Sequence, residues 1–131
     1  MPSVSIVTGA NRGIGQELVR ALIGRGHHVI ATCRASAGEL SSLGAEVVSG
    51  VDVTKPDVGD TLADVLGDRK LGLLINNAGV LTRQSLDDMD FDAMRHQYEV
   101  NALGPLRVTK ALLSSMDAGS KVAIVSSRMG S

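Results

Sequence analysis

The chain has 131 residues, 44% of them hydrophobic, and a formal net charge of -1 at pH 7. This length suits one domain with a buried core, and the near-neutral charge excludes a global attraction to nucleic acid or anionic lipid. Aromatic residues make up only 2%, which argues against a surface that stacks single-stranded bases, and the one cysteine, Cys33, excludes an internal disulfide framework and fits a reducing compartment.

The first half of the chain alternates short apolar runs with amphipathic stretches. From Ile14 to Leu22, apolar residues recur at the spacing of one helix face, and glycines at 24 and 26 end the pattern. The expected elements of this half are a strand at 4–7, a helix at 14–22, a strand at 29–32, a weak helix at 36–43 and a strand at 46–53.

The second half continues the same alternation. A helix is expected from Pro56, a strand over 71–75, a long helix over about 90–116 and a fifth strand over 121–125. Pro105 should bend the long helix or leave one backbone hydrogen bond open. Alternating strands and helices predict an α/β fold: a Rossmann-like, doubly wound parallel sheet of about five strands, in a single domain over 1–131.

No window of the sequence reaches the length of a transmembrane helix, and the first strand follows Met1 without a basic, apolar leader. We therefore expect a cytoplasmic protein without membrane partners. No metal site is expected either, because His27, His28 and His96 have no ligand spacing with Cys33 or with paired carboxylates.

A glycine-rich loop carries the strongest local signal. Residues 8–15 read Thr-Gly-Ala-Asn-Arg-Gly-Ile-Gly, between a predicted strand and a predicted helix. Gly9 would permit a tight turn, Gly13 would let a pyrophosphate approach the backbone, and Gly15 would allow close packing of helix and strand. The free N–H groups and positive dipole end of the helix would favour phosphate. The alternative is a glycine-rich turn that binds no ligand.

Four motifs in order give the chain a family resemblance. The loop at 8–15 is followed by Asn76–Gly79 at the end of the fourth strand, by Val100-Asn101 in the long helix, and by the serine-bearing segment 125–130. This set, with Asp52-Val53, resembles the short-chain dehydrogenase/reductase family. The Ser-Ser-Arg-Met-Gly-Ser ending is similar to the carbonyl-reductase-like branch that includes C-factor-type proteins.

The resemblance implies binding of a nicotinamide dinucleotide at the carboxyl ends of the strands, and it assigns roles to individual positions. Asn101 would hold a water in a proton relay and Ser127 would orient a substrate carbonyl; the plain alternatives are a helix-bending polar residue and a strand-end hydroxyl. The positions assigned to cofactor binding are Gly9, Asn11, Arg12, Gly13, Ile14, Gly15, Arg34, Asp52, Val53, Asn77, Ala78 and Gly79.

The end of the second strand favours NADP(H) over NAD(H). An acidic residue about twenty positions past the glycines would bind the ribose 2'-hydroxyl, whereas an arginine accommodates a 2'-phosphate. Arg34 stands at this place, no acid occurs before Glu39, and Arg12 adds a second guanidinium within the loop. Either arginine could instead be an ordinary exposed side chain.

The family pattern continues with a Tyr-x-x-x-Lys about a dozen residues past the serine. The only tyrosine here is Tyr98, and the residue four positions later is Ala102. We therefore expect an incomplete NADP(H)-dependent oxidoreductase of a carbonyl/alcohol pair, acting on a small-molecule carbonyl compound once completed. The alternative is a non-catalytic nucleotide-binding or interaction protein. An uncovered fifth strand and a long helix with apolar residues on several sides predict a homo-oligomer.

Overall fold

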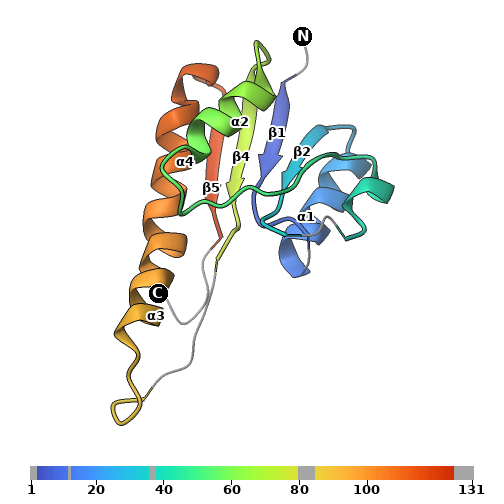
Figure 1. The fold of residues 1–131 in the computed structure, drawn as a ribbon. Coiled ribbons are helices and arrows are strands. Elements are labelled where there is room, and N and C mark those ends of the chain that lie inside the picture. Colours follow the sequence, from blue (N-terminus) through green and yellow to red (C-terminus); the bar gives the residue numbers. More distant parts are fainter. Residues whose placement is uncertain (1–2, 12, 36–37, 80–84, 126–131) are drawn as a thin grey trace.

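The protein is described by a computed structural model, which covers residues 3–11, 13–35, 38–79 and 85–125. Within these ranges the chain alternates strands and helices as the sequence predicts (Figure 1). In chain order the elements are β1 (Val4–Val7), α1 (Gly13–Gly24), β2 (His28–Thr32), the 3₁₀ turn η1 (Leu40–Leu43), β3 (Glu46–Val48), α2 (Val58–Leu66), β4 (Leu71–Asn76), α3 (Phe91–Tyr98), the π-helical turn η2 (Glu99–Leu103), α4 (Gly104–Leu112), the 3₁₀ turn η3 (Leu113–Ser115) and β5 (Lys121–Ile124).

The described strands form one parallel sheet in the order β3-β2-β1-β4-β5. Successive residues of a strand point to opposite faces, so Ile6 packs toward α2 and α4 while Val7 packs toward α1 and η1. The connections before β3, α1 and η1, thus cover one face of the sheet, and the later helices α2 and α4 cover the other. This arrangement confirms the predicted doubly wound α/β fold, and it gathers the carboxyl ends of all the described strands at one edge.

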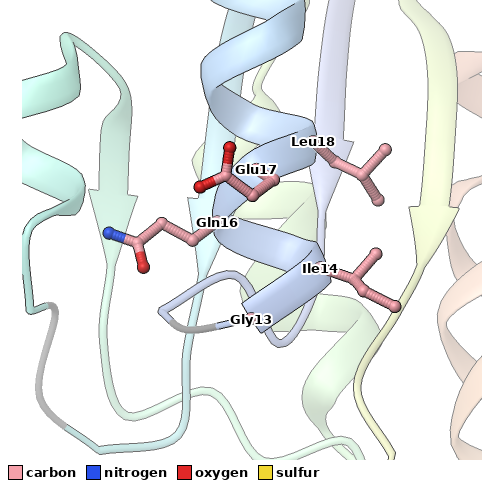
Figure 2. A pocket seen from close by; sticks show the side chains of 5 residues that line it. All are labelled: Gly13, Ile14, Gln16, Glu17 and Leu18. Carbon is pink, nitrogen blue, oxygen red and sulfur yellow. The ribbon is translucent and has the colours of Figure 1, made fainter.

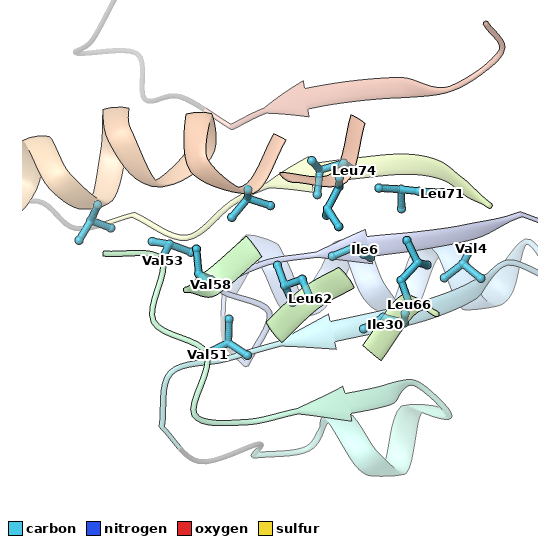
Figure 3. Packing of buried hydrophobic residues seen from close by; sticks show 13 residues of the cluster. Val4, Ile6, Ile30, Val51, Val53, Val58, Leu62, Leu66, Leu71 and Leu74 are labelled. Atoms are coloured by element: carbon cyan, nitrogen blue, oxygen red, sulfur yellow. The ribbon is translucent and has the colours of Figure 1, made fainter. Parts of the chain in front are cut away.

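The two faces of the sheet are covered by separate apolar clusters. The larger one lies under α2 and α4, where Leu62, Leu66, Val108 and Leu112 are completely or almost completely buried. Figure 3 shows how the α2 side chains meet those of the central strands. The helix expected from Pro56 is therefore confirmed and buries one apolar face, although it begins at Val58.

The predicted apolar face of α1 is only partly correct. Val19 is fully buried against the sheet, whereas Ile14 is 64% exposed. Figure 2 shows Ile14 and Leu18 projecting to one side of α1 and Gln16 to another. They line an open hollow of about 520 Å³, although Leu18 is also partly buried against the apolar cluster on this face of the sheet. The fully buried residues of the helix are Gly15 and Val19, and a glycine contributes nothing to an apolar periodicity.

The third strand is shorter than predicted: it ends at Val48 and not at residue 53. Gly50 adopts a left-handed backbone with φ +75°, which turns the chain out of the strand. One hydrogen bond, from Val51 N–H to the Cys33 carbonyl (3.0 Å), still ties the turn to the end of β2. The apolar Val51 and Val53 are buried after all, but under the helices instead of in the sheet. Similarly, where a weak helix is expected at 36–43, the described residues form only the 3₁₀ turn Leu40–Leu43.

The predicted long helix is interrupted by one wide turn. Asp90 caps its start by accepting a hydrogen bond from the Ala93 N–H (3.1 Å), and α3, η2, α4 and η3 follow without a break. In η2 the Gly104 N–H donates to the Glu99 carbonyl, five residues earlier. Pro105 has no N–H to donate, and the wide turn lies directly before it. The expected disturbance at Pro105 is thus confirmed, in the form of a π-helical turn.

Candidate nucleotide-binding site

A cavity of about 550 Å³ opens at the carboxyl ends of β1, β2 and β4, within the size range of small-molecule sites. It is walled by the glycine loop, the end of β2, the segment after β3, the end of β4 and η2. The residues that line it are Gly9, Asn11, Gly13, Ile14, Thr32, Arg34, Ala35, Val51, Asp52, Val53, Asn77, Ala78, Gly79 and Val100. All the positions proposed to bind cofactor that the structure describes line this cavity, except Gly15.

The glycine loop is shaped by two different requirements. Gly9 has φ +59°, and a Cβ added there would lie 2.6 Å from the Ala78 Cα, so the backbones of the loop and of the β4 end approach directly. Gly13 has φ +57° and no atom within 4 Å of a hypothetical Cβ. Glycine is therefore needed at position 13 for its left-handed backbone, which few other residues adopt, and not for lack of space. The loop therefore presents bare backbone toward the cavity.

Gly15 lies beneath the cavity instead of lining it. A Cβ at this position would stand 2.4 Å from the Gly9 carbonyl oxygen and 2.5 Å from the Asn77 Nδ2. The sequence predicts close packing of helix and strand here. The closest atoms belong instead to the loop itself and to the Asn77 side chain, so Gly15 sets the shape of the loop.

Thr8 holds the loop to the end of β4, a role that the motif did not assign to it. Its side chain is buried, and its Oγ1 accepts hydrogen bonds from the N–H groups of Asn77 (3.0 Å) and Ala78 (3.1 Å). In return, Asn77 Nδ2 donates to the Gly9 carbonyl (3.0 Å). No local pattern in the sequence indicates this role, because the groups that the Thr8 hydroxyl binds lie about seventy positions away in the chain.

The cavity is lined by side chains of opposite charge, Asp52 and Arg34. Asp52 Oδ1 accepts hydrogen bonds from the Thr54 hydroxyl (2.7 Å) and the Thr54 N–H (2.9 Å). The hydroxyl bond is the main cause that lowers the pKa of Asp52, and the positive charges of Lys55 and Arg34 lower it further. Asp52 is therefore a carboxylate near neutral pH. Arg34 is exposed at the cavity just past β2, where the sequence places it.

Of the two predicted catalytic residues, the structure describes Asn101 alone. Asn101 is exposed in η2, with its Oδ1 3.2 Å from the place that a Cβ on Gly79 would occupy, so it stands at the cavity mouth beside the end of β4. The preceding Val100 is buried and lines the cavity. Ser127 and Arg12 lie outside the described residues.

The described ranges contain neither a cluster of metal ligands nor a membrane-spanning helix. Among these residues no three His, Cys, Asp or Glu side chains gather closely enough to hold a metal ion. Nor does any helix in this part of the chain combine the length and apolarity that crossing a membrane requires.

Comparison with known proteins gives the glycine loop and cavity a family context. The sequence profile described as short chain dehydrogenase matches residues 3–131. The chain belongs to the short-chain dehydrogenase family. It is 39% identical over 131 residues to 1-hydroxy-2-glutathionyl-2-methyl-3-butene dehydrogenase of Rhodococcus sp. (strain AD45), a match that covers 98% of this chain and 58% of that protein. The predicted family resemblance is confirmed.

Two further members of this family bear on the carbonyl-reductase-like branch. The C-signal protein of Myxococcus xanthus is 50% identical over 62 residues, which cover 45% of this chain and 37% of that protein. A carbonyl reductase from Pseudomonas aeruginosa PAO1, solved in complex with NADP, superposes with a TM-score of 0.87 at 31% identity, over 100% of this chain and 63% of that one. The chain thus spans about three fifths or less of the relatives named here.

Proposed function

We propose that this short-chain dehydrogenase binds NADP(H) and serves in the oxidoreduction of a carbonyl/alcohol pair. The observation that carries the proposal is the cavity itself, where the glycine loop, Asp52-Val53 and Asn77–Gly79 converge on one space. These are the segments that the family resemblance assigns to a dinucleotide. The NADP-bound carbonyl reductase of similar fold supports the same cofactor class.

The residues present fit such a cofactor. The bare backbone at Gly9 and Gly13, next to the first turn of α1, would receive the pyrophosphate. Asp52 and Val53 would hold the adenine, and Asn77–Gly79 would border the ribose on the nicotinamide side. When bound, the cofactor would supply or accept the hydride. Asn101 would hold a water near the cavity mouth, and Ser127 would orient the substrate carbonyl by hydrogen bonding.

NADPH is proposed over NADH because a guanidinium, and no carboxylate, follows β2 at the cavity. Arg34 can pair with a 2'-phosphate, and charge-assisted hydrogen bonds contribute about 1.5–3 kcal/mol. Calorimetric titration should show NADPH binding about tenfold or more tightly than NADH. Arg34→Gln should remove most of this preference, whereas Arg25→Gln, a charge change beyond the far end of α1, should leave it intact. Equal affinities of the unmodified chain for both cofactors would refute the assignment.

A second candidate function concerns the 131-residue polypeptide alone: binding of the nucleotide without turnover. The observation that favours it is that the only tyrosine, Tyr98, is followed four positions later by Ala102 instead of lysine. A tuned phenol is the proton donor of the related enzymes, and proton transfer by a positioned side chain contributes about 10²–10⁴-fold. We expect no measurable consumption of NADPH with simple aldehydes or ketones. Steady consumption that Ser127→Ala abolishes would contradict this expectation.

A further inference from the structure

The π-helical turn η2 forms one wall of the nucleotide cavity. Its Val100 is buried and lines the cavity, and the next residue, Asn101, stands beside Gly79. A wide turn inserts one residue into a helix and rotates the side chains that follow it, and such turns occur frequently at functional sites. The position of this wall therefore depends on what supports η2 against the rest of the chain.

An ion pair spans the turn from end to end. Arg107 Nη2 lies 2.8 Å from Glu99 Oε2, and the two side chains are 30% and 39% exposed. Glu99 is the first residue of η2, and Arg107 lies one turn into α4, eight positions later. Ordinary ion pairs on a helix join residues three or four apart. The pair between Arg95 and Asp92 on the neighbouring α3 is of this ordinary kind, at 2.8 Å.

The same guanidinium also reaches the segment after β3, which forms another wall of the cavity. Arg107 Nη1 donates a long hydrogen bond, 3.5 Å, to the carbonyl of Val53. Val53 lines the cavity and also packs on the helix, because a Cβ added to Gly104 would lie 2.8 Å from the Val53 Cγ2. Arg107 is not among the residues that line the cavity. It thus contacts one residue of each segment, Glu99 of η2 and Val53, without lining the cavity itself.

We propose that Arg107 is a positioning residue that fixes the segment 51–53 against η2 and thereby sets the spacing of these two cavity walls. The inference rests on the proposed function in one respect: the ligand whose affinity reports the spacing is NADPH. The residue acts through Val53 and Glu99 and makes no contact of its own with the nucleotide. Its loss should weaken nucleotide binding through the wall at Val53.

The first test compares two arginines on the same helical run. Arg107→Met keeps the length of the side chain but removes the ion pair and the bond to Val53. It should weaken NADPH binding by up to about fivefold, which is the effect of losing one hydrogen bond of ordinary strength and an upper bound for a bond as long as 3.5 Å. Arg95→Met removes an equally short ion pair on α3 that touches no cavity wall, and it should leave the dissociation constant unchanged. Equal effects of the two substitutions would overturn the proposal.

A charge swap separates positioning from simple helix stability. In the double variant Glu99→Arg/Arg107→Glu the ion pair can re-form, but a carboxylate then faces the Val53 carbonyl and cannot donate to it. The melting temperature of the double variant should be higher than that of Arg107→Met and close to that of the unmodified chain. Its NADPH binding should stay as weak as in Arg107→Met. Recovery of both would show that Arg107 acts only through Glu99, and the positioning role would be lost.

A measurement without nucleotide keeps this inference distinct from the proposed function. In the free protein, the nuclear Overhauser effect between the Val53 methyl groups and the Gly104 α-protons reports the contact of the two walls. It should weaken in Arg107→Met and in the charge swap, and persist in Arg95→Met. Failure of the unmodified chain to bind NADPH would refute the proposed function alone. An unchanged Overhauser effect in Arg107→Met would refute the positioning role alone.

Discussion

At the scale of single residues, Gly15 occupies a place where a methyl group has no room. Gly15→Ala would press its Cβ against the Gly9 carbonyl and the Asn77 side-chain amide, which lie 2.4 and 2.5 Å from the Cβ position. Overpacking of this kind costs about 1–3 kcal/mol. We expect a lower melting temperature, and also weaker NADPH binding, since the displaced Gly9 belongs to the loop that is proposed to receive the pyrophosphate.

A second glycine of the same helix provides the control. Gly24 ends α1, and a Cβ there would meet no atom within 4 Å. Gly24→Ala should therefore be neutral, or stabilising by about 0.4–1 kcal/mol through the unfolded chain. Thermal unfolding and calorimetric titration of both variants check the pair. A Gly15→Ala variant as stable as Gly24→Ala would mean that the loop is looser than its contacts indicate.

The residues of the site differ in how well the sequence predicts them. Gly9 and Gly13 belong to the glycine loop and Asn77 to the segment 76–79, and the order of these two motifs along the chain sufficed to predict that they meet at one cavity. Thr8 was not recognised as the tie between loop and strand, because its hydrogen bonds reach residues about seventy positions away. Such long-range partners leave no local trace in a sequence.

At the scale of elements, the short strand β3 is fastened to α2 by one arginine. Arg69 donates from Nε to the Leu66 carbonyl (2.9 Å) and from Nη2 to the Val65 carbonyl (2.7 Å), at the end of α2. It also pairs with Glu46 on β3 through both of its terminal nitrogens, at 2.9 and 3.2 Å. These bonds from Arg69, followed by one with His28, lower the pKa of Glu46 from 4.5 to about 2.

This pKa predicts how stability depends on pH. Because the folded state favours the Glu46 carboxylate, its contribution is fully present above about pH 4.5 and is lost as the pH falls toward 2. The side chains of Arg69 and Glu46 are 30% and 36% exposed, so solvent screening limits the contribution to about 1 kcal/mol.

Glu46→Gln should lower the free energy of unfolding at pH 7 by about this amount, and it should flatten the dependence between pH 4.5 and 2. Urea unfolding across this range provides the measurement. Glu17→Gln removes the exposed partner of Arg20 on α1 and serves as the control, with little expected change. If both variants follow the same pH curve, the Glu46–Arg69 pair contributes nothing specific.

The boundaries of the elements were predicted less accurately than the elements themselves. The run 46–53 reads as one strand because its apolar residues are indeed buried, yet Gly50 turns it away from the sheet after Val48. The apolar residues of the long helix are likewise buried only in part: Val108 and Leu112 are buried in α4, whereas no residue of α3 is. The π-helical turn was not predicted as such, since one inserted residue shifts a periodic pattern too little to be recognised.

At the scale of the whole molecule, the two helical layers among the described residues leave β5 exposed. Every residue of β5 is exposed, including Val122 (42%) and Ile124 (59%). On the long helical run beside it, Leu106 (64%), Leu113 (57%) and Tyr98 (60%) are exposed as well. An apolar strand edge with free backbone groups is a template for pairing, and contiguous apolar surface marks sites of association.

We therefore predict that the 131-residue chain associates with itself, or with another polypeptide, through β5 and this helical run. Size-exclusion chromatography with light scattering should show a mass above that of one 13.6 kDa chain. Ile124→Lys and Leu106→Lys place charges on the open side, and desolvating those charges should shift the distribution toward monomer. Leu86→Lys, at a residue that is 90% exposed in the segment before α3, should leave it unchanged. A monodisperse monomer of the unmodified chain would show that this apolar surface is stable in water, and the predicted homo-oligomer would be wrong.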